Sequence, residues 1–359
     1  MPEGKWFRRG YAIALILLII YLGTLVDFIF RPVTVLITAL FGPIVLGGIF
    51  YYLLRPLVNL LAKKMPKPFA ILLLYLAVIG LITGVFFYVG PILQKQVNSL
   101  IDNTPQLIEK FRDTLLNLQQ NEWVSRFQES DRFSLETITN RLTDYLNEAA
   151  TTLGSNLMNI ISTITNIIVL IILIPFVLYY MLKDGNKLPG KVLKLVPQKH
   201  ENEGKKVLRD MDEALSSYIQ GQVIVSFCVG VLVYIGYLII GLDYSLVIAI
   251  LTMLTNVIPF VGPFISSVPA VIVGFLQEPI MALWVIIVIL VVQQIEGNLI
   301  SPQVMGRKLD IHPLTIILLL VAAGQFAGFL GLLLAVPTYA ILKVIFTHVY
   351  RFIKLRTNL

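Results

Sequence analysis

Four polar side chains follow a strongly apolar run and could bind an ion or a polar solute. Glu296 lies just beyond the run "ALWVIIVILVV", and its polar neighbours along the chain are Gln293, Gln294 and Asn298. Gln293 and Glu296 are three residues apart and Gln294 and Asn298 are four apart, so in a helix each pair can share a face. A carboxylate that faces the interior of a membrane bundle can carry protons or bind cations. The alternative is that Glu296 simply reaches water at a helix end.

A second polar site is expected where prolines interrupt an apolar segment. The stretch "TNVIPFVGPF" contains Asn256, Pro259, Gly262 and Pro263. Each proline lacks the N–H group that a helix requires and biases the preceding residue away from helical geometry. Carbonyl groups freed at membrane depth must be buried in protein or line a wet cavity. We therefore predict a helix break at 255–263 that offers carbonyl oxygens and Asn256 to a solute or ion pathway.

A third candidate group combines one glutamine with three glycines. The stretch "VAAGQFAGFLG" at 321–331 contains Gly324, Gln325, Gly328 and Gly331 inside another apolar segment. We expect Gln325 to face the pathway from the opposite side. The glycines are expected to serve as a hinge or to allow close helix packing.

Both interrupted segments are too long for ordinary single spans. Residues 244–276 and 313–343 would form helices of roughly 50 and 46 Å, against about 30 Å of hydrocarbon. Two interrupted segments of this kind indicate a transport site built from discontinuous helices. The segments either cross the membrane fully or return as re-entrant hairpins, and we favour hairpins.

The composition identifies the elements that carry these residues as membrane helices. Hydrophobic residues make up 57% of the 359 residues and charged residues only 14%, whereas about a quarter of a soluble domain is charged. We predict an all-α polytopic membrane protein with about eight hydrophobic elements, two of them broken or re-entrant. These elements are expected near residues 11–30, 33–54, 69–90, 156–182, 214–240, 244–276, 279–297 and 313–343.

Polar stretches divide these elements into regions. Helical spacing of apolar residues at 107–118 and 135–153 predicts two amphipathic helices in an extracytoplasmic insert at 91–155. Their apolar faces would pack on their own subunit, on the membrane surface or on a neighbouring subunit. The other regions are three spans at 1–90, a fourth span at 156–182, a cytoplasmic connector at 183–213, a transport core at 214–343 and a cytoplasmic tail at 344–359.

The distribution of basic residues predicts the orientation in the membrane. With both termini in the cytoplasm and both interrupted segments returning as hairpins, 21 of the 28 Lys and Arg residues lie inside and 7 outside. This asymmetry obeys the positive-inside rule. The first apolar segment lacks a cleavage site, so we expect it to remain as a span.

The sequence lacks the residues that several classes of function require. The chain has one cysteine, Cys228, and three histidines, and it contains no H-E-x-x-H, C-x-x-C or phosphate-binding loop. We therefore expect no metal or other cofactor, no ATP hydrolysis and no enzymatic activity. The net charge of +7 is explained by membrane topology, and no nucleic-acid partner is expected.

Four stretches are distinctive: "PFVLYYMLKDG" (175–185), "NVIPFVGPF" (256–264), "QIEGNLISPQVMG" (294–306) and "HPLTIILLLVAAGQFAGFLGLLLAVP" (312–337). Together they resemble the autoinducer-2 exporter family of bacterial membrane transporters. The resemblance implies a multi-span protein of the bacterial inner membrane, a homo-oligomer, that moves small solutes without hydrolysing ATP. Autoinducer-2 export serves quorum sensing, and other members of that family are associated with sodium or lithium/proton exchange.

These observations support one main hypothesis of function and two alternatives. The main hypothesis is a secondary transporter or exporter of a small polar solute, similar to autoinducer-2 by resemblance, with Glu296 as the proton-coupling group. The first alternative is a sodium or lithium/proton antiporter, in which a monovalent cation binds Glu296. The second is a non-transporting scaffold in the lipid bilayer, which would explain the polar insert but not the two interrupted segments.

Overall fold

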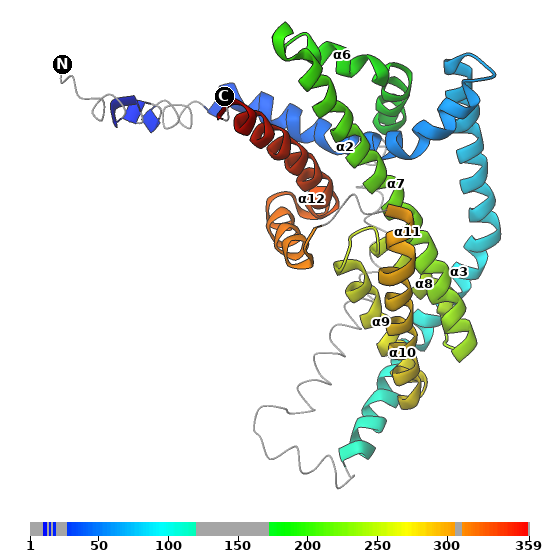
Figure 1. Cartoon of the computed structure of the whole chain (residues 1–359). Helices are drawn as coiled ribbons and strands as arrows, with labels where there is room; N and C mark the ends of the chain where they lie inside the picture. The colour runs from blue at the N-terminus through cyan, green and yellow to red at the C-terminus, as the bar shows by residue number, and fades with distance from the viewer. Residues whose placement is uncertain are drawn as a thin grey trace.

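The computed structural model describes residues 10–12, 14–15, 17–18, 27–119, 172–305 and 311–357, and its regular elements there are all helical (Figure 1). Three short helical turns join the longer helices: η1 (Gly185–Lys187), η2 (Gln198–His200) and the π-helical η3 (Glu296–Ile300). The α-helices with defined ends are α2 (Asp27–Leu61), α3 (Lys67–Gln119), α6 (Leu188–Leu193), α7 (Glu201–Ile240), α8 (Ser245–Thr255), α9 (Val261–Gln277), α10 (Pro279–Ile295), α11 (Ser301–Met305) and α12 (Pro313–Thr357). Residues 172–184 are helical as well.

Five helical stretches in the described part are long and apolar enough to cross a membrane, which makes the chain a multi-pass membrane protein. Most of the predicted elements at 11–30 and 156–182 lie outside the described residues, so the number eight stays a prediction. The helices α8 and α9 are apolar but shorter, at 11 and 17 residues. The five stretches are Arg31–Leu61, Lys67–Ser99, Gln198–Ile240, Pro279–Met305 and Pro313–Arg351.

The span at the start of α3 continues without a break into the stretch predicted to be a separate amphipathic helix. Helix α3 has 53 residues, or about 80 Å, and includes 107–118. Its distal half docks on the start of α8, where Asn103 donates a hydrogen bond to the Tyr244 hydroxyl (3.1 Å) and Gln96 accepts one from the Val247 N–H (3.3 Å). The second predicted amphipathic helix, at 135–153, lies outside the described residues.

Helix α7 is the centre of the main core. Its buried residues Val225, Val229, Val233 and Tyr237 pack with buried residues of α8, α9 and α10 in one cluster. Figure 1 shows α8, α9 and α10 gathered around the second half of α7. A smaller cluster joins the middle of α7 to α2 and α12. These two helices contribute Ile49, Tyr52 and Leu53 from α2 and Val336 from α12.

The first of two interruptions joins α8 to α9. Helix α8 ends at Thr255, and the chain turns through Phe260, which has a positive φ of 62°. A Cβ atom at Gly262 would collide with the carbonyl oxygen of Thr255, so the start of α9 packs directly against the end of α8. The result is a tight helical hairpin that only glycine permits at position 262.

The second interruption lies within α12. The backbone leaves helical geometry at Ala327 (φ −136°, ψ 18°) and at Gly328 (φ 56°, ψ −136°). A Cβ atom at Gly331 would collide with the Ala323 carbonyl oxygen, and one at Gly324 would come within 3.1 Å of the Leu332 side chain. The two limbs of α12 therefore fold against each other, as α8 and α9 do in the first hairpin.

The two hairpins meet in a small apolar cluster. Ile258, from the first turn, is buried together with Leu320 and Ala335, which come from the two limbs of α12. The turn between α8 and α9 thus sits against both limbs of the second hairpin. This arrangement brings residues 256–263 close to α12 and leaves space between them.

Candidate functional site

Asn256 occupies the centre of the first interruption and is fully buried. Its Nδ2 donates a hydrogen bond to Oε1 of Glu296 at 3.4 Å. Its Oδ1 has no hydrogen-bond partner among the described residues. A buried amide oxygen without a donor is costly, so this atom has the capacity to accept one further hydrogen bond.

The carbonyl group of Asn256 is satisfied from another helix. Gln222 of α7, only 5% exposed, donates its Nε2–H to this carbonyl oxygen at 2.6 Å. The Thr255 carbonyl oxygen accepts from the Ile258 N–H at 3.0 Å, because Pro259 has no N–H to offer. The broken backbone therefore keeps its shape through one local bond and one amide from α7.

Glu296 faces Asn256 from the end of α10. Its Oε2 accepts a hydrogen bond from Nε2 of Gln293 at 3.3 Å, so amides reach both carboxylate oxygens. The residue begins the π-helical turn Glu296–Ile300, and such turns are frequent at functional sites. None of the ion pairs formed within the described part of the chain includes Glu296.

A cavity of about 390 Å³ adjoins this group, within the usual range for binding sites of about 300–1,000 Å³. It lies between the first interruption, the middle of α7, the end of α10 and both limbs of α12. Its polar lining comes mainly from Gln222, Gln293 and Glu296. The full lining is Tyr218, Gln222, Pro259, Phe260, Pro263, Gln293, Glu296, Gly297, Ser301, Met305, Ile311, Ile316 and Val336.

The balance of donors and acceptors defines what the cavity can hold. The carboxylate in its lining, Glu296, is bonded only to neutral amides, and Asn256, which bonds this carboxylate from outside the lining, has an unpaired acceptor oxygen. A group that supplies hydrogen-bond donors or positive charge would complete this set. A proton on Glu296, a monovalent cation and a solute rich in hydroxyl groups all meet that condition.

The structure brings together only part of the set expected from the sequence. Gln294 and Asn298 are exposed and bond to each other at 2.8 Å, on a different face of the helix from Glu296. Adjacent residues differ by about 100° around a helix, so Gln293 and Gln294 cannot both face the cavity. Gln325 is exposed near the bend of α12 and does not line the cavity.

The two α7 residues that line the cavity were not expected from the sequence. Gln222 and Tyr218 lie one turn apart on α7 and both line the cavity. The signal was present, because "YIQGQVIVSF" places two glutamines in a mostly apolar stretch. What the sequence lacked was any indication of which glutamine faces the break at Asn256.

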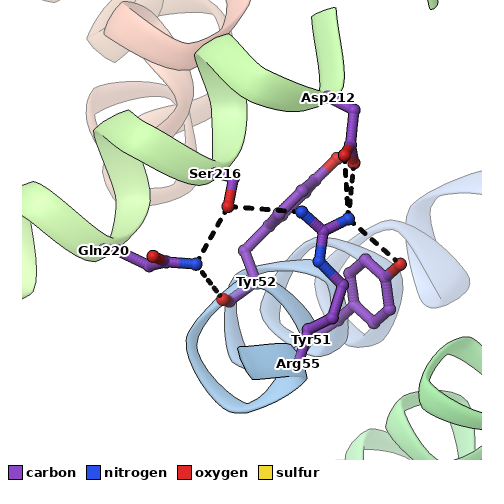
Figure 2. A network of polar contacts seen from close by, with 6 residues as sticks. All are labelled: Tyr51, Tyr52, Arg55, Asp212, Ser216 and Gln220. Carbon is purple, nitrogen blue, oxygen red and sulfur yellow. Dashed lines mark hydrogen bonds and ion pairs between the residues drawn. The ribbon is translucent and has the colours of Figure 1, made fainter. Parts of the chain in front are cut away.

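A second polar network joins α2 to α7 (Figure 2). Nη1 of Arg55 donates to both carboxylate oxygens of Asp212, at 2.7 and 2.9 Å, and Nη2 donates to Ser216 at 3.3 Å. Gln220 extends the network by donating to Ser216 at 2.9 Å and to the Tyr52 carbonyl oxygen at 2.7 Å. The guanidinium also lies over the rings of Tyr51 and Tyr52, 5.4 and 5.2 Å from their centroids.

The comparisons with known proteins agree on one family. The profile of the AI-2E family transporter matches residues 12–351. The chain is 44% identical to the Bacillus subtilis protein named "Putative transport protein YueF", over 96% of this chain and 93% of YueF. It is 25% identical to the Escherichia coli "AI-2 transport protein TqsA", over 84% of each chain. With its all-helical fold, its membrane spans and a family profile that matches nearly its whole length, the chain belongs to the AI-2E family of transporters.

Proposed function

We propose that this protein is a secondary transporter or exporter of a small polar solute and that the solute passes through the cavity between the two hairpins. The observation that carries the proposal is the acceptor-rich group at the break in the α8–α9 hairpin: a buried Asn256 with an unpaired Oδ1, hydrogen-bonded to the uncompensated carboxylate of Glu296. Autoinducer-2 is the solute that the name of TqsA suggests.

Each polar residue has a distinct role in this proposal. Glu296 accepts hydrogen bonds from the hydroxyl groups of the solute, and Asn256 and Gln293 hold its carboxylate in place. Gln222 fixes the turn by bonding the Asn256 carbonyl oxygen. Protonation of Glu296 would remove the strongest acceptor, so a proton gradient could couple to release of the solute.

The two hairpins offer a physical route to alternating access. Their shared apolar contact at Ile258, Leu320 and Ala335 is the point where one hairpin would slide or tilt relative to the other. Transporters commonly open by rocking one such unit against another around a fixed site. In this proposal residues 214–343 form the transport core, with Gly324, Gly328 and Gly331 shaping its second hairpin.

We propose the following setting in the cell. The protein lies in the bacterial inner membrane with both termini in the cytoplasm, since this orientation places 21 of 28 basic residues inside. The stretch 91–155 is then extracytoplasmic, and 183–213 and 344–359 are cytoplasmic. A homo-oligomer would use faces of the insert that do not pack on its own subunit.

Uptake of labelled autoinducer-2 into everted membrane vesicles tests the proposal. We expect saturable, gradient-dependent uptake by the wild type, and at least a tenfold loss with Glu296→Gln, because the carboxylate is the strongest acceptor in the cavity. Asn298→Ala is the matched control, since this polar residue lies close to Glu296 in the chain but on the exposed face.

Other outcomes of the same experiment contradict the proposal. Absence of uptake by correctly inserted wild type would remove this solute. If the same vesicles exchange sodium or lithium for protons and Glu296→Gln abolishes the exchange, the chain is an antiporter. Absence of both activities would favour the scaffold hypothesis.

A further inference from the structure

A second pocket, separate from the hairpin cavity, lies where α2, residues 180–192 and α7 meet. It has a volume of about 470 Å³, and most of its lining residues are apolar or aromatic. Tyr51 and Tyr52 contribute from α2, and Leu208, Met211 and Leu215 contribute from α7. The pocket is large enough for part of an acyl chain or a small amphiphile.

The edge of this pocket is basic. Residues 183–194 contain Lys183, Lys187, Lys191 and Lys194, spaced three or four residues apart, and one acid, Asp184. Lys187 and Lys191 line the pocket, and the Lys187 side chain is 72% exposed. A ligand that enters here therefore meets ammonium groups at the edge and apolar surface inside.

Both acidic residues of the lining already have basic partners. Lys187 donates a hydrogen bond to Asp184 at 2.6 Å, which lowers the pKa of that carboxyl, so it stays ionised at neutral pH. Asp212 is held by Arg55 at 2.7 Å. Lys187 keeps two further N–H donors, and Lys191 is exposed. The pocket edge therefore retains donors and positive charge for an anion.

The pocket lies at the boundary between the membrane and water. The stretch Gln198–Ile240 has 43 residues, about 64 Å of helix, and its charged first half must extend beyond the roughly 30 Å of hydrocarbon. Tyrosines such as Tyr51 and Tyr180 are typical of this boundary. Leu188 and Leu195, near the lysines, are 61% and 86% exposed, which suits a segment that lies on a bilayer surface.

We propose that this pocket binds an anionic phospholipid, with its phosphate against Lys187 and Lys191 and part of an acyl chain among the residues of α2 and α7. Basic pockets between membrane helices are typical sites for anionic head groups. The bound lipid would brace the junction of α2 and α7 beside Arg55. This inference does not depend on the transported solute.

Native mass spectrometry of the detergent-solubilised full chain tests the inference. The probes are phosphatidylglycerol and phosphatidylcholine with identical acyl chains. We expect tighter binding of phosphatidylglycerol, and a loss of about fivefold in its affinity for each lysine replaced in Lys187→Gln and Lys191→Gln. Binding of phosphatidylcholine should change less than twofold. The charge-matched control, Lys199→Gln with Lys206→Gln, replaces exposed lysines outside the pocket and should preserve the preference.

Two further measurements distinguish the contribution of the apolar pocket from that of the lysine charges. Leu215→Trp fills the pocket and should weaken both lipids, whereas the lysine variants should weaken only the anionic one. Free glycerol phosphate, tested as a competitor, should not displace phosphatidylglycerol. Equal binding of the two lipids by the wild type, an unchanged preference in the lysine variants, or displacement by glycerol phosphate would each overturn the inference.

Discussion

Two of the polar networks that fasten α7 to other described helices differ in how their charges are balanced. Around Arg55, the guanidinium meets a carboxylate at 2.7 Å, a serine hydroxyl and two aromatic rings. Around Glu296, the carboxylate meets only amides, at 3.3 and 3.4 Å. Asn256 adds a buried oxygen that lacks a partner within the described residues.

We take this difference in charge balance to distinguish a structural joint between helices from a ligand-binding site. Removing one partner from a compensated pair leaves a charge unpaired, so the arrangement resists change. An acceptor-rich group with long hydrogen bonds instead has capacity for a donor from outside the protein. We therefore interpret the Arg55 network as a fixed joint between α2 and α7, and the Glu296 network as the place where a ligand is exchanged.

The largest effect on stability is expected from Gln222→Leu, because this change strips the donor from a buried carbonyl group. The carbonyl oxygen of Asn256 would remain buried and unpaired, which costs about 1–3 kcal/mol. Denaturant unfolding in detergent measures the loss, and vesicle uptake should fall as well because the turn loses its shape. Gln222→Glu is the matched control, since a protonated side chain can still donate. Stability equal to that of the wild type in Gln222→Leu would contradict this role.

A smaller effect is expected from Arg55→Met, since Asp212 is 44% exposed and water can solvate it. We expect a loss of about 1 kcal/mol, with uptake per folded molecule unchanged. The double variant Arg55→Met with Asp212→Leu should recover part of the loss, because no charge is left unpaired. If Arg55→Met abolished uptake in folded protein, the distinction between joint and site would fail.

The smallest effect is expected from Asn298→Ala. Its side chain bonds Gln294 on an exposed face, and surface changes of this kind usually alter stability by less than about 0.5 kcal/mol. Both the unfolding free energy and uptake should match the wild type. A strong loss of uptake would show that the polar face of Gln294 and Asn298 belongs to the pathway.

Local chemistry accounts for much of the fold. The all-helical class and the membrane spans follow from long apolar runs, which the structure forms as helices. The prolines near Asn256 and the glycines near Gln325 lie where the structure ends or bends its helices. In each case the cause is a missing N–H group or a missing Cβ atom, which can be recognised one residue at a time.

Contacts between distant residues could not be predicted in the same way. Gln222 and Asn256 are 34 residues apart, and Arg55 and Asp212 are 157 apart, so their pairing depends on how whole helices pack. From their spacing in the sequence, Gln293 and Gln294 were equally good candidates to line the pathway, although only one of them can face the cavity. Gln325 was expected at the pathway because it is polar, yet the bend of α12 leaves it exposed.

The most direct test of the central claim is thiol labelling of Gly297→Cys in a Cys228→Ser background. Gly297 lines the cavity beside Glu296, and a Cβ atom there meets open space. We predict that a charged maleimide labels this cysteine in vesicles, and that autoinducer-2 protects it but not a reference thiol at Asn298→Cys. A thiol at 297 that reacts only with lipid-soluble reagents would contradict the account, because the cavity would then not be a wet pathway.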